Sequence, residues 1–495
     1  MDAVVRTRQG AVRGSEAEGV STFKGIPYAA PLFGINRFRT PQPVETWSGV
    51  RDALIYGATV PKPPYFPPFD VLLPEPVVPG EDSLNLNIWS PDLGQARLPV
   101  MVWIHGGAFS NGSSAITQYD GGRFARDGVV CVTINYRLGA DGFLYLADGP
   151  ANLGLLDQVA ALEWVRDNIA AFGGDPGNVT IFGESAGAMS VGTLLSMPRA
   201  AGLFRRAIAQ SGAGHHAISS ATARRISQYL AEKLGVTPTR EAIAAVPIDR
   251  LLQAQVELSA DVFNIPDPAR WGEVSANQMP FEPVIDGNVL PALPIERIAA
   301  GAGAGVDVMV GTNTEEERLF MVPNGAINHT TEAILAGTVA AYGLPAEATL
   351  ATYRATRRDA SAGDLLEAIV TDWFFRIPAI RLAEASVTSN SPTFMYEFAW
   401  RSPQFDGRLG ACHALEIPFV FDTLDDTSLE PLLGTSAPQP IADTMHAAWV
   451  AFATKGEPGW SRYDLQRRAT MRFDTTSEVV DDPRSAERSL WAGLR

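Results

Sequence analysis

Continuous apolar runs recur along the chain and are separated by segments of mixed polarity. The runs occupy residues 83–89, 99–107, 128–139, 178–183, 306–313 and 392–400. Apolar runs of this length, without alternating polar residues, are typical of strands that are covered on both faces. They therefore predict the buried strands of a sheet.

Segments between these runs carry apolar residues at helical spacing. Helix is predicted after residue 152, and Gly173, Gly174 and Pro176 end it. A second helix is predicted over 186–197, before Pro198. Because strand and helix alternate, we expect an α/β fold with a mostly parallel central sheet flanked by helices.

Two longer stretches, 215–280 and 325–390, are rich in Ala, Leu, Glu and Arg and are predicted to be mainly helical. The sequence has no internal repeat and no clear linker. We therefore expect a single domain over residues 1–495, with both stretches as helical excursions from one α/β core.

The segment 61–80, "PKPPYFPPFDVLLPEPVVPG", holds eight prolines, at positions 61, 63, 64, 67, 68, 74, 76 and 79. Proline at this density disfavours both helix and central strand, so the segment is predicted to be a long loop. Loops of this length often form lids or binding loops. We expect this one to border the substrate entrance, and a surface excursion without a role is the alternative.

Composition and charge exclude several classes of function. The net charge of −16 argues against nucleic acid and anionic membrane partners. No stretch approaches the about 18 uncharged apolar residues of a membrane-spanning helix, and the N-terminus lacks the apolar segment of a signal peptide. Cys131 and Cys412 are expected to be buried free thiols, which favours a reducing compartment and a cytoplasmic protein.

The sequence Gly183-Glu184-Ser185-Ala186-Gly187 fits the pattern G-x-S-x-G and lies between a predicted strand and a predicted helix. Glycine at both ends allows a sharp turn that lifts the serine hydroxyl above the edge of the sheet. This arrangement predicts that Ser185 is a nucleophile. The alternative is a tight structural turn whose serine caps the helix.

A serine nucleophile needs an oxyanion hole and a base. The stretch "WIHGGAF", residues 103–109, follows a strand and offers backbone N–H groups for the oxyanion. His413 lies in a short loop that runs into the apolar segment "IPFVF". This is where the base is expected, so His413 is favoured. Four other histidines fit this role less well. His446 lies on a predicted helix, and His215 and His216 lie too close to Ser185 in sequence. His329 lies in a polar stretch.

The acid that orients the base is expected after a strand between Ser185 and His413. The strand at 306–313 is followed by Glu315, Glu316 and Glu317. Their chemistry is identical, so the residues alone leave the choice among the three open.

Together these motifs resemble the type-B carboxylesterase family, which includes bacterial esterases and the cholinesterases. The matching stretches run from about residue 20 to 460 and include "EDSLNLNIW", "NYRLGADGF", "TIFGESAGA", "GTNTEEE" and "HALEIPFVF". The resemblance implies an α/β-hydrolase fold and a triad of Ser185, Glu316 and His413.

The same resemblance implies further roles for individual residues. The backbone amides of Gly107, Ala108 and Ala186 would form the oxyanion hole. Glu184 would tune the electrostatics of the site. Arg37 and Glu81 would form a structural ion pair.

The expected function is that of a serine carboxylic ester hydrolase that works through an acyl-enzyme on a small-molecule ester. No metal or organic cofactor is expected, and the sequence does not indicate an oligomeric state or an acyl preference. Activity is expected to fall at acid pH as His413 gains a proton, with a midpoint at about pH 6–7. The alternatives are an amidase or lipase with the same triad, or a non-catalytic binding protein on this fold.

Overall fold

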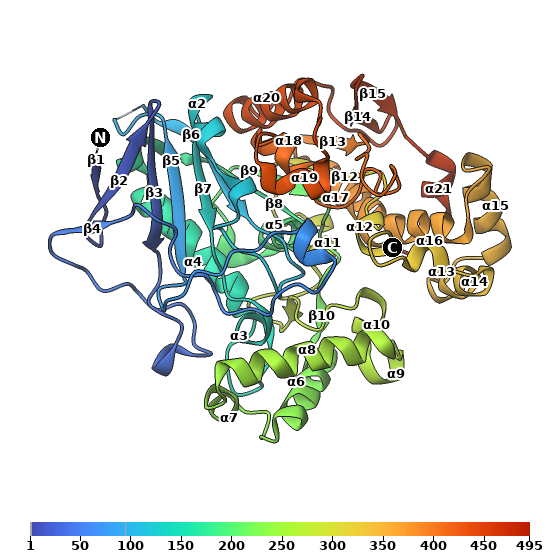
Figure 1. The fold of residues 1–495 in the computed structure, drawn as a ribbon, viewed down its shortest axis with the longest axis horizontal. Coiled ribbons are helices and arrows are strands. Elements are labelled where there is room, and N and C mark those ends of the chain that lie inside the picture. The colour runs from blue at the N-terminus through green and yellow to red at the C-terminus, as the bar shows by residue number, and fades with distance from the viewer. Residues whose placement is uncertain (1, 95) are drawn as a thin grey trace.

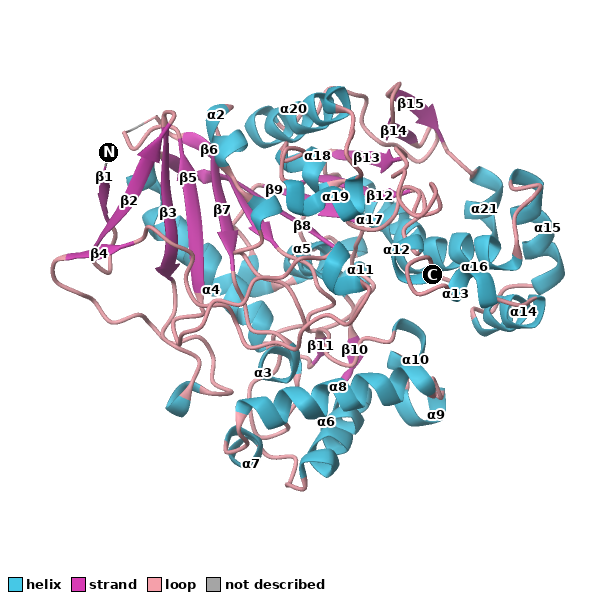
Figure 2. Ribbon diagram, viewed as in Figure 1, coloured by secondary structure: helices cyan, strands magenta, loops and turns pink. Residues whose placement is uncertain are grey.

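The computed structural model describes residues 2–94 and 96–495, and its strands form one large sheet with helices on both faces (Figures 1 and 2). The sheet has 13 strands. Their spatial order is β1 (Asp2–Arg6), β2 (Ala11–Ala17), β3 (Val20–Pro27), β5 (Asn85–Ser90), β7 (Val130–Ile134), β6 (Leu98–Ile104), β8 (Gly174–Glu184), β9 (Arg206–Gln210), β12 (Asp307–Asn313), β13 (Thr393–Phe398), β14 (Ala469–Phe473) and β15 (Glu478–Asp481), and β4 (Val50–Asp52) pairs with β2.

In the spatial order, the strands from β7 through β14 are parallel. The pairs of β1 with β2, β2 with β3, β3 with β5, β5 with β7 and β14 with β15 are antiparallel. All six apolar runs form strands in this sheet, so the prediction of an α/β fold with a parallel core is confirmed. The strands β1 to β4 were not predicted, and β4 runs parallel to its partner β2. A separate pair, β10 (Ile218–Ser219) and β11 (Val284–Ile285), lies outside the large sheet.

Helices that pack directly on the sheet include α2 (Gly122–Arg126), α4 (Leu153–Asn168), α5 (Ala186–Ser196), α18 (Ile417–Phe421) and α20 (Gln439–Lys455). Neighbouring side chains of β6 point to opposite faces of the sheet. Val102 belongs to the core that contains α4 and α5, whereas Trp103 belongs to the core that contains α2, α18 and α20. Because both faces are covered, the strand reads as a continuous apolar run.

Both predicted stretches are mainly helical and belong to the same core, but they lie apart from each other, the first at the bottom of the view and the second at its right (Figure 1). The first contains α6 (Ser220–Leu234), α7 (Arg240–Ala244), α8 (Ile248–Asn264), α9 (Pro268–Trp271) and α10 (Val274–Asn277). The second contains α13 (Ala326–His329), α14 (Glu332–Ala341), α15 (Ala346–Thr356), α16 (Ala362–Thr371) and α17 (Ile377–Thr388). The remaining helices are α1 (Phe69–Leu72), α3 (Gly139–Phe143), α11 (Pro294–Ala299), α12 (Arg318–Met321), α19 (Glu430–Leu433) and α21 (Ser485–Leu490).

The segment 61–80 departs from the prediction at one point, because it contains the single-turn helix α1. Pro68 immediately precedes this helix, where its missing N–H group breaks no helical hydrogen bond. The prolines therefore limit the helix to one turn without excluding it.

Within the part of the chain that the structure describes, no single helix is long and apolar enough to cross a membrane. Only α14 and α15 taken together meet the criteria of length and composition, and these two helices are bent by 115°.

The ion pair that the resemblance implied between Arg37 and Glu81 is not formed. Arg37 Nε lies 3.0 Å from Asp141 Oδ1, and both side chains are buried. Glu81 is exposed. A second buried pair joins Arg137 to Asp157, with two contacts of 2.7 Å between the guanidinium and the carboxylate.

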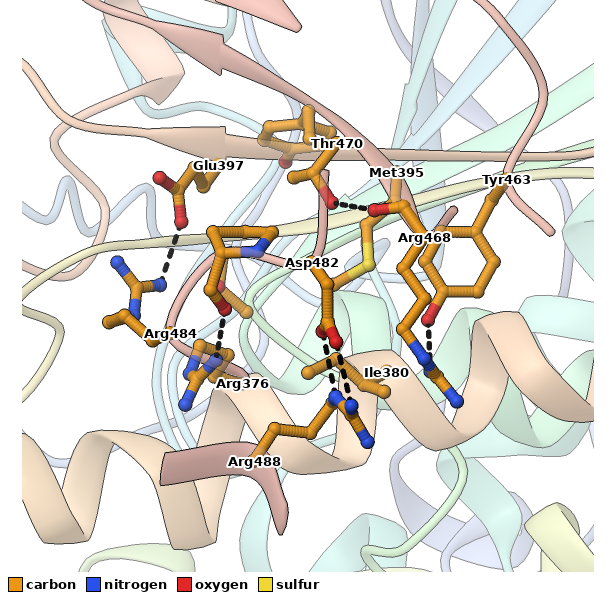
Figure 3. A pocket seen from close by; sticks show the side chains of 13 residues that line it. Arg376, Ile380, Met395, Glu397, Tyr463, Arg468, Thr470, Asp482, Arg484 and Arg488 are labelled. Atoms are coloured by element: carbon orange, nitrogen blue, oxygen red, sulfur yellow. Dashed lines mark hydrogen bonds and ion pairs between the residues drawn. The ribbon is translucent and has the colours of Figure 1, made fainter. Parts of the chain in front are cut away.

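An arginine network attaches the C-terminal elements to the edge of the sheet (Figure 3). Arg484 lies 2.7 Å from Glu397 of β13, and Arg488 makes two contacts of 2.7 Å with Asp482. The space that these side chains enclose is about 10 Å³, which is room for one water molecule at most. The guanidinium groups have carboxylates as partners, so we interpret the network as structural.

We expect Asp157→Asn to lower the free energy of unfolding by about 3–5 kcal/mol, because it leaves the buried Arg137 guanidinium without its counter-charge. Asp425→Asn is the matched control. Its partner Arg123 and Asp425 itself are exposed, so the expected loss is about 0–1 kcal/mol. Urea unfolding followed by tryptophan fluorescence measures both, and equal losses would contradict the prediction.

Candidate active site

Ser185 lies in a sharp turn between β8 and α5, as predicted. Its backbone angles, φ 55° and ψ −124°, are unfavourable for a residue with a side chain. The flanking glycines make the turn possible. A Cβ on Gly187 would stand 1.9 Å from the carbonyl oxygen of Ile104, and one on Gly183 would stand 2.5 Å from it.

The backbone of Ser185 is tied to both neighbouring elements. Its N–H donates to the carbonyl of Gln210 in β9 at 2.9 Å, and its carbonyl accepts from Met189 in α5 at 2.8 Å. The hydroxyl makes no hydrogen bond to any residue among those described. It lies at a pocket that His413 also lines.

The turn after β12 brings one of the three glutamates to His413. Glu316 is fully buried, and its Oε2 lies 2.8 Å from His413 Nδ1. Its Oε1 accepts a hydrogen bond from the N–H of Asn313 at 2.8 Å. Both oxygens are therefore held in place, and the carboxylate is positioned to orient the imidazole.

The two neighbouring glutamates are directed elsewhere. Glu315 contacts Arg318 at 2.9 Å and accepts a hydrogen bond from the N–H of Ala411 at 3.0 Å. Burial raises the pKa of Glu317 to about 7. Among the three, the structure thus gives only Glu316 a contact with the ring of His413.

The other nitrogen of the imidazole faces a second carboxylate. His413 Nε2 lies 3.0 Å from Glu184 Oε1, and the structure shows no hydrogen bond from Nε2 to Ser185. Burial alone would lower the pKa of His413, but Glu184 and Glu316 outweigh it and raise the pKa well above 6.5. This direction favours a midpoint of activity above the value of about pH 6–7 that an unperturbed histidine predicts.

Aromatic rings cover the histidine. The ring centroid of Phe375 lies 4.8 Å from that of His413, and the centroid of Phe320 lies 5.4 Å away. These contacts keep water from the imidazole and strengthen its interaction with both carboxylates.

The predicted oxyanion residues present free backbone donors. Gly107 and Ala108 line the pocket with φ angles of 108° and 51°. Ala186 is the first residue of α5, where an N–H group has no partner inside the helix. Within the described residues, none of these three N–H groups has a hydrogen-bond acceptor.

The pocket at Ser185 is small and mostly apolar. Its volume is about 140 Å³, and Tyr65, Leu73 and Pro74 of segment 61–80 form part of its wall. The expectation that this segment borders the site agrees with that lining. A wider groove of about 530 Å³ lies outside it, between the same segment and α8, and both spaces share Tyr65 and Asn111.

The other candidate histidines lie apart from this pocket. His446 is buried in α20, with Nδ1 2.7 Å from the carbonyl oxygen of Val420. Burial lowers the pKa of His215 to about 3 and lowers that of His216 strongly. His329 is exposed at the end of α13.

One buried acidic residue of the site was not predicted. Glu416 accepts hydrogen bonds from Asn313 Nδ2 at 2.7 Å and Gln210 Nε2 at 3.1 Å. Burial, together with the charges of Glu184 and Glu316, raises its pKa to about 8. Its position three residues after His413 was the only signal in the sequence, and it does not reveal that burial.

Comparisons with known proteins agree with this geometry. Residues 1–491 match the family described as the carboxylesterase family. The chain is 38% identical to the para-nitrobenzyl esterase of Bacillus subtilis, over 98% of this chain and 97% of that protein. It is 34% identical to carboxylesterase 1E of Mus musculus, over 99% and 93%.

Solved structures show the same fold. A carboxylesterase of Geobacillus stearothermophilus superposes with a TM-score of 0.86 at 39% identity, covering 99% of each chain. A structure of PNB esterase gives a TM-score of 0.82 at 35% identity, again over 99% of each chain. The fold is therefore that of the α/β-hydrolases, and the chain belongs to the carboxylesterase family.

Proposed function

We propose that this chain hydrolyses small-molecule carboxylic esters with Ser185 as nucleophile, His413 as base and Glu316 as the orienting acid. The observation that carries this proposal is the buried 2.8 Å contact between Glu316 Oε2 and His413 Nδ1, at the pocket that holds Ser185. The family match over residues 1–491 supports one catalytic domain for the whole chain.

In the proposed reaction, Ser185 Oγ attacks the ester carbonyl carbon while its proton passes to His413 Nε2. The amides of Gly107, Ala108 and Ala186 stabilise the oxyanion that forms. His413 then protonates the departing alcohol, and a water molecule deprotonated by His413 releases the acid from the acyl-enzyme. Nε2 must first turn from Glu184 to Ser185, an adjustment that is common when a substrate enters an empty site.

The two neighbouring spaces, which share Tyr65 and Asn111 in their walls, suggest how a substrate is placed. The inner pocket of about 140 Å³ accommodates a small group next to the carbonyl, and the groove of about 530 Å³ accommodates a larger remainder. Two buried, unpaired thiols, Cys131 and Cys412, support a cytoplasmic location for the enzyme.

Amidase and lipase activities use the same machinery, so the leaving group must be tested directly. Matched p-nitrophenyl esters and p-nitroanilides of one acid separate the esterase from the amidase, and a series of acyl lengths separates the esterase from a lipase. We expect hydrolysis of short-chain esters and none of the anilides. Binding without hydrolysis of either would indicate a non-catalytic protein.

Replacing Ser185 by Ala should abolish esterase activity while leaving the fold intact, because it removes the hydroxyl that attacks the carbonyl and adds no bulk to the turn. A serine-reactive fluorophosphonate should label the wild type at Ser185 alone, which peptide mass spectrometry detects. Circular dichroism serves as the control for folding. Residual activity in Ser185→Ala, or labelling at another serine, would contradict the assignment.

Glu316→Gln should reduce kcat by about 10³–10⁴-fold, because an amide stabilises the wrong tautomer of the imidazole. Glu315→Gln and Glu317→Gln are matched controls one residue away on either side, and each should stay within about tenfold of wild type. Steady-state kinetics on p-nitrophenyl acetate compares the three. If a control were the crippled variant, the assignment would be off by one position.

The pH profile tests the charge around His413. Only the neutral imidazole accepts a proton, so kcat/KM should rise with pH through a midpoint above 6.5. Glu184→Gln removes one of the two carboxylates that raise the pKa of His413, and its midpoint should move to lower pH. Glu81→Gln, an exposed carboxylate, should leave the profile unchanged; coincident profiles for all three proteins would rule out this role of Glu184.

A further inference from the structure

A buried ion pair lies within segment 61–80, next to the loop that offers the oxyanion donors. Lys62 Nζ lies 3.8 Å from Glu75 Oε1, and the two side chains are 2% and 7% exposed. Both residues belong to the proline-rich segment. Removing two charged groups from water costs free energy, so a buried pair needs further hydrogen bonds to offset that cost.

Both carboxylate oxygens of Glu75 accept hydrogen bonds from the neighbouring loop. Its Oε1 accepts from the backbone N–H of Gly112, and its Oε2 accepts from Asn111 Nδ2 at 3.1 Å. The same Asn111 amide donates to the carbonyl of Pro63 at 2.7 Å. One carboxylate thus links the segment to two consecutive residues of the loop.

The peptide that Glu75 holds packs directly on an oxyanion residue. A Cβ on Gly107 would stand 2.3 Å from the carbonyl oxygen of Asn111 and 3.0 Å from the nitrogen of Gly112. The carbonyl of Gly107 in turn accepts the N–H of Asn111 at 2.8 Å. Any displacement of the Asn111–Gly112 peptide therefore displaces Gly107.

The backbone of this loop is strained, so it needs such support. Gly107, Ala108 and Phe109 are consecutive residues with positive φ angles of 108°, 51° and 56°. Residues with a side chain remain in this region only where surrounding contacts hold them. The N–H of Gly139 supports Phe109 from one side, through a 2.7 Å hydrogen bond to its carbonyl, and Glu75 supports the other end of the loop.

Lys62 has an electrostatic part in the arrangement. An unpaired carboxylate beside the oxyanion hole would oppose the negative charge that develops on the substrate. The ammonium of Lys62 offsets that charge, and it also donates to the carbonyl of Pro76 at 3.4 Å. The pair supplies the hydrogen bonds of a carboxylate with little net field at the reacting carbonyl.

We propose that Glu75 is a positioning residue for the oxyanion hole and that Lys62 is its neutralising partner. Segment 61–80 is then part of the catalytic machinery as well as a wall of the pocket. This inference rests on the proposed function, because it requires that Gly107 and Ala108 stabilise an oxyanion.

The test compares Glu75→Gln and Glu75→Ala with Asp70→Asn and Glu81→Gln, two exposed carboxylates in or next to the same segment. Rates are expressed per active site, titrated with the fluorophosphonate, so that loss of folded protein does not count. For both Glu75 variants we expect kcat to fall by about 10–100-fold, with KM within about threefold. The two control variants should match wild type.

A second readout separates positioning from a structural role. The affinity of a trifluoromethyl ketone, whose hemiketal oxyanion occupies the hole, should fall in parallel with kcat/KM in the Glu75 variants. Lys62→Met should also lower kcat, and the loss should be smaller when Glu75→Gln is already present, because no unpaired carboxylate remains. If Glu75→Ala fails to fold, Glu75→Gln decides the question.

The outcomes distinguish the positioning role of Glu75 from the proposed function. Unchanged kcat and unchanged ketone affinity per titrated site in Glu75→Gln would overturn the positioning role and leave the triad intact. An active Ser185→Ala variant would overturn the proposed function itself, whatever the Glu75 variants show.

Discussion

The contact between the turn after β8 and the end of β6 is the constraint on which the site depends. Gly187 lies so close to the carbonyl oxygen of Ile104 that only glycine fits there. This packing holds Ser185 in a backbone conformation that a side chain disfavours. Because β6 continues directly into the loop of Gly107 and Ala108, one contact sets Ser185 and the backbone amides of that loop relative to each other.

Charge around His413 involves a compromise. Glu316 and Glu184 contact opposite nitrogens of a buried imidazole, so they favour the imidazolium that forms when the ring takes a proton. The same attraction reduces the fraction of neutral imidazole at lower pH. The raised pKa of Glu416, to about 8, limits the negative charge that it adds to that of Glu184 and Glu316 near neutral pH.

Local signals in the sequence predicted most of the core and of the site. The six apolar runs and the glycines around Ser185 can be recognised from neighbouring residues alone. Their interpretation therefore needs no knowledge of the tertiary structure. These local signals did not distinguish Glu316 from Glu315 and Glu317, because the three carboxylates differ only in how the turn after Asn313 directs them. The choice of Glu316 came from the family resemblance. The sequence did not predict which residues pair across long distances in the chain. Arg37 pairs with Asp141, 104 positions away, and not with Glu81. The contact of Glu75 with Gly112 is of the same kind.

The two helical excursions have a consequence for how such a chain can change over time. The first begins after β9 and the second after β12, and neither interrupts the hydrogen-bonded ladder of the large sheet. α8 forms a wall of the outer groove, and Phe375, which precedes α17, covers His413. Insertions or deletions within the excursions can therefore alter the groove and the cover of His413 without shifting the strands that carry the candidate site. The fold keeps reactivity and access on separate stretches of chain, so each can diverge while the other is preserved.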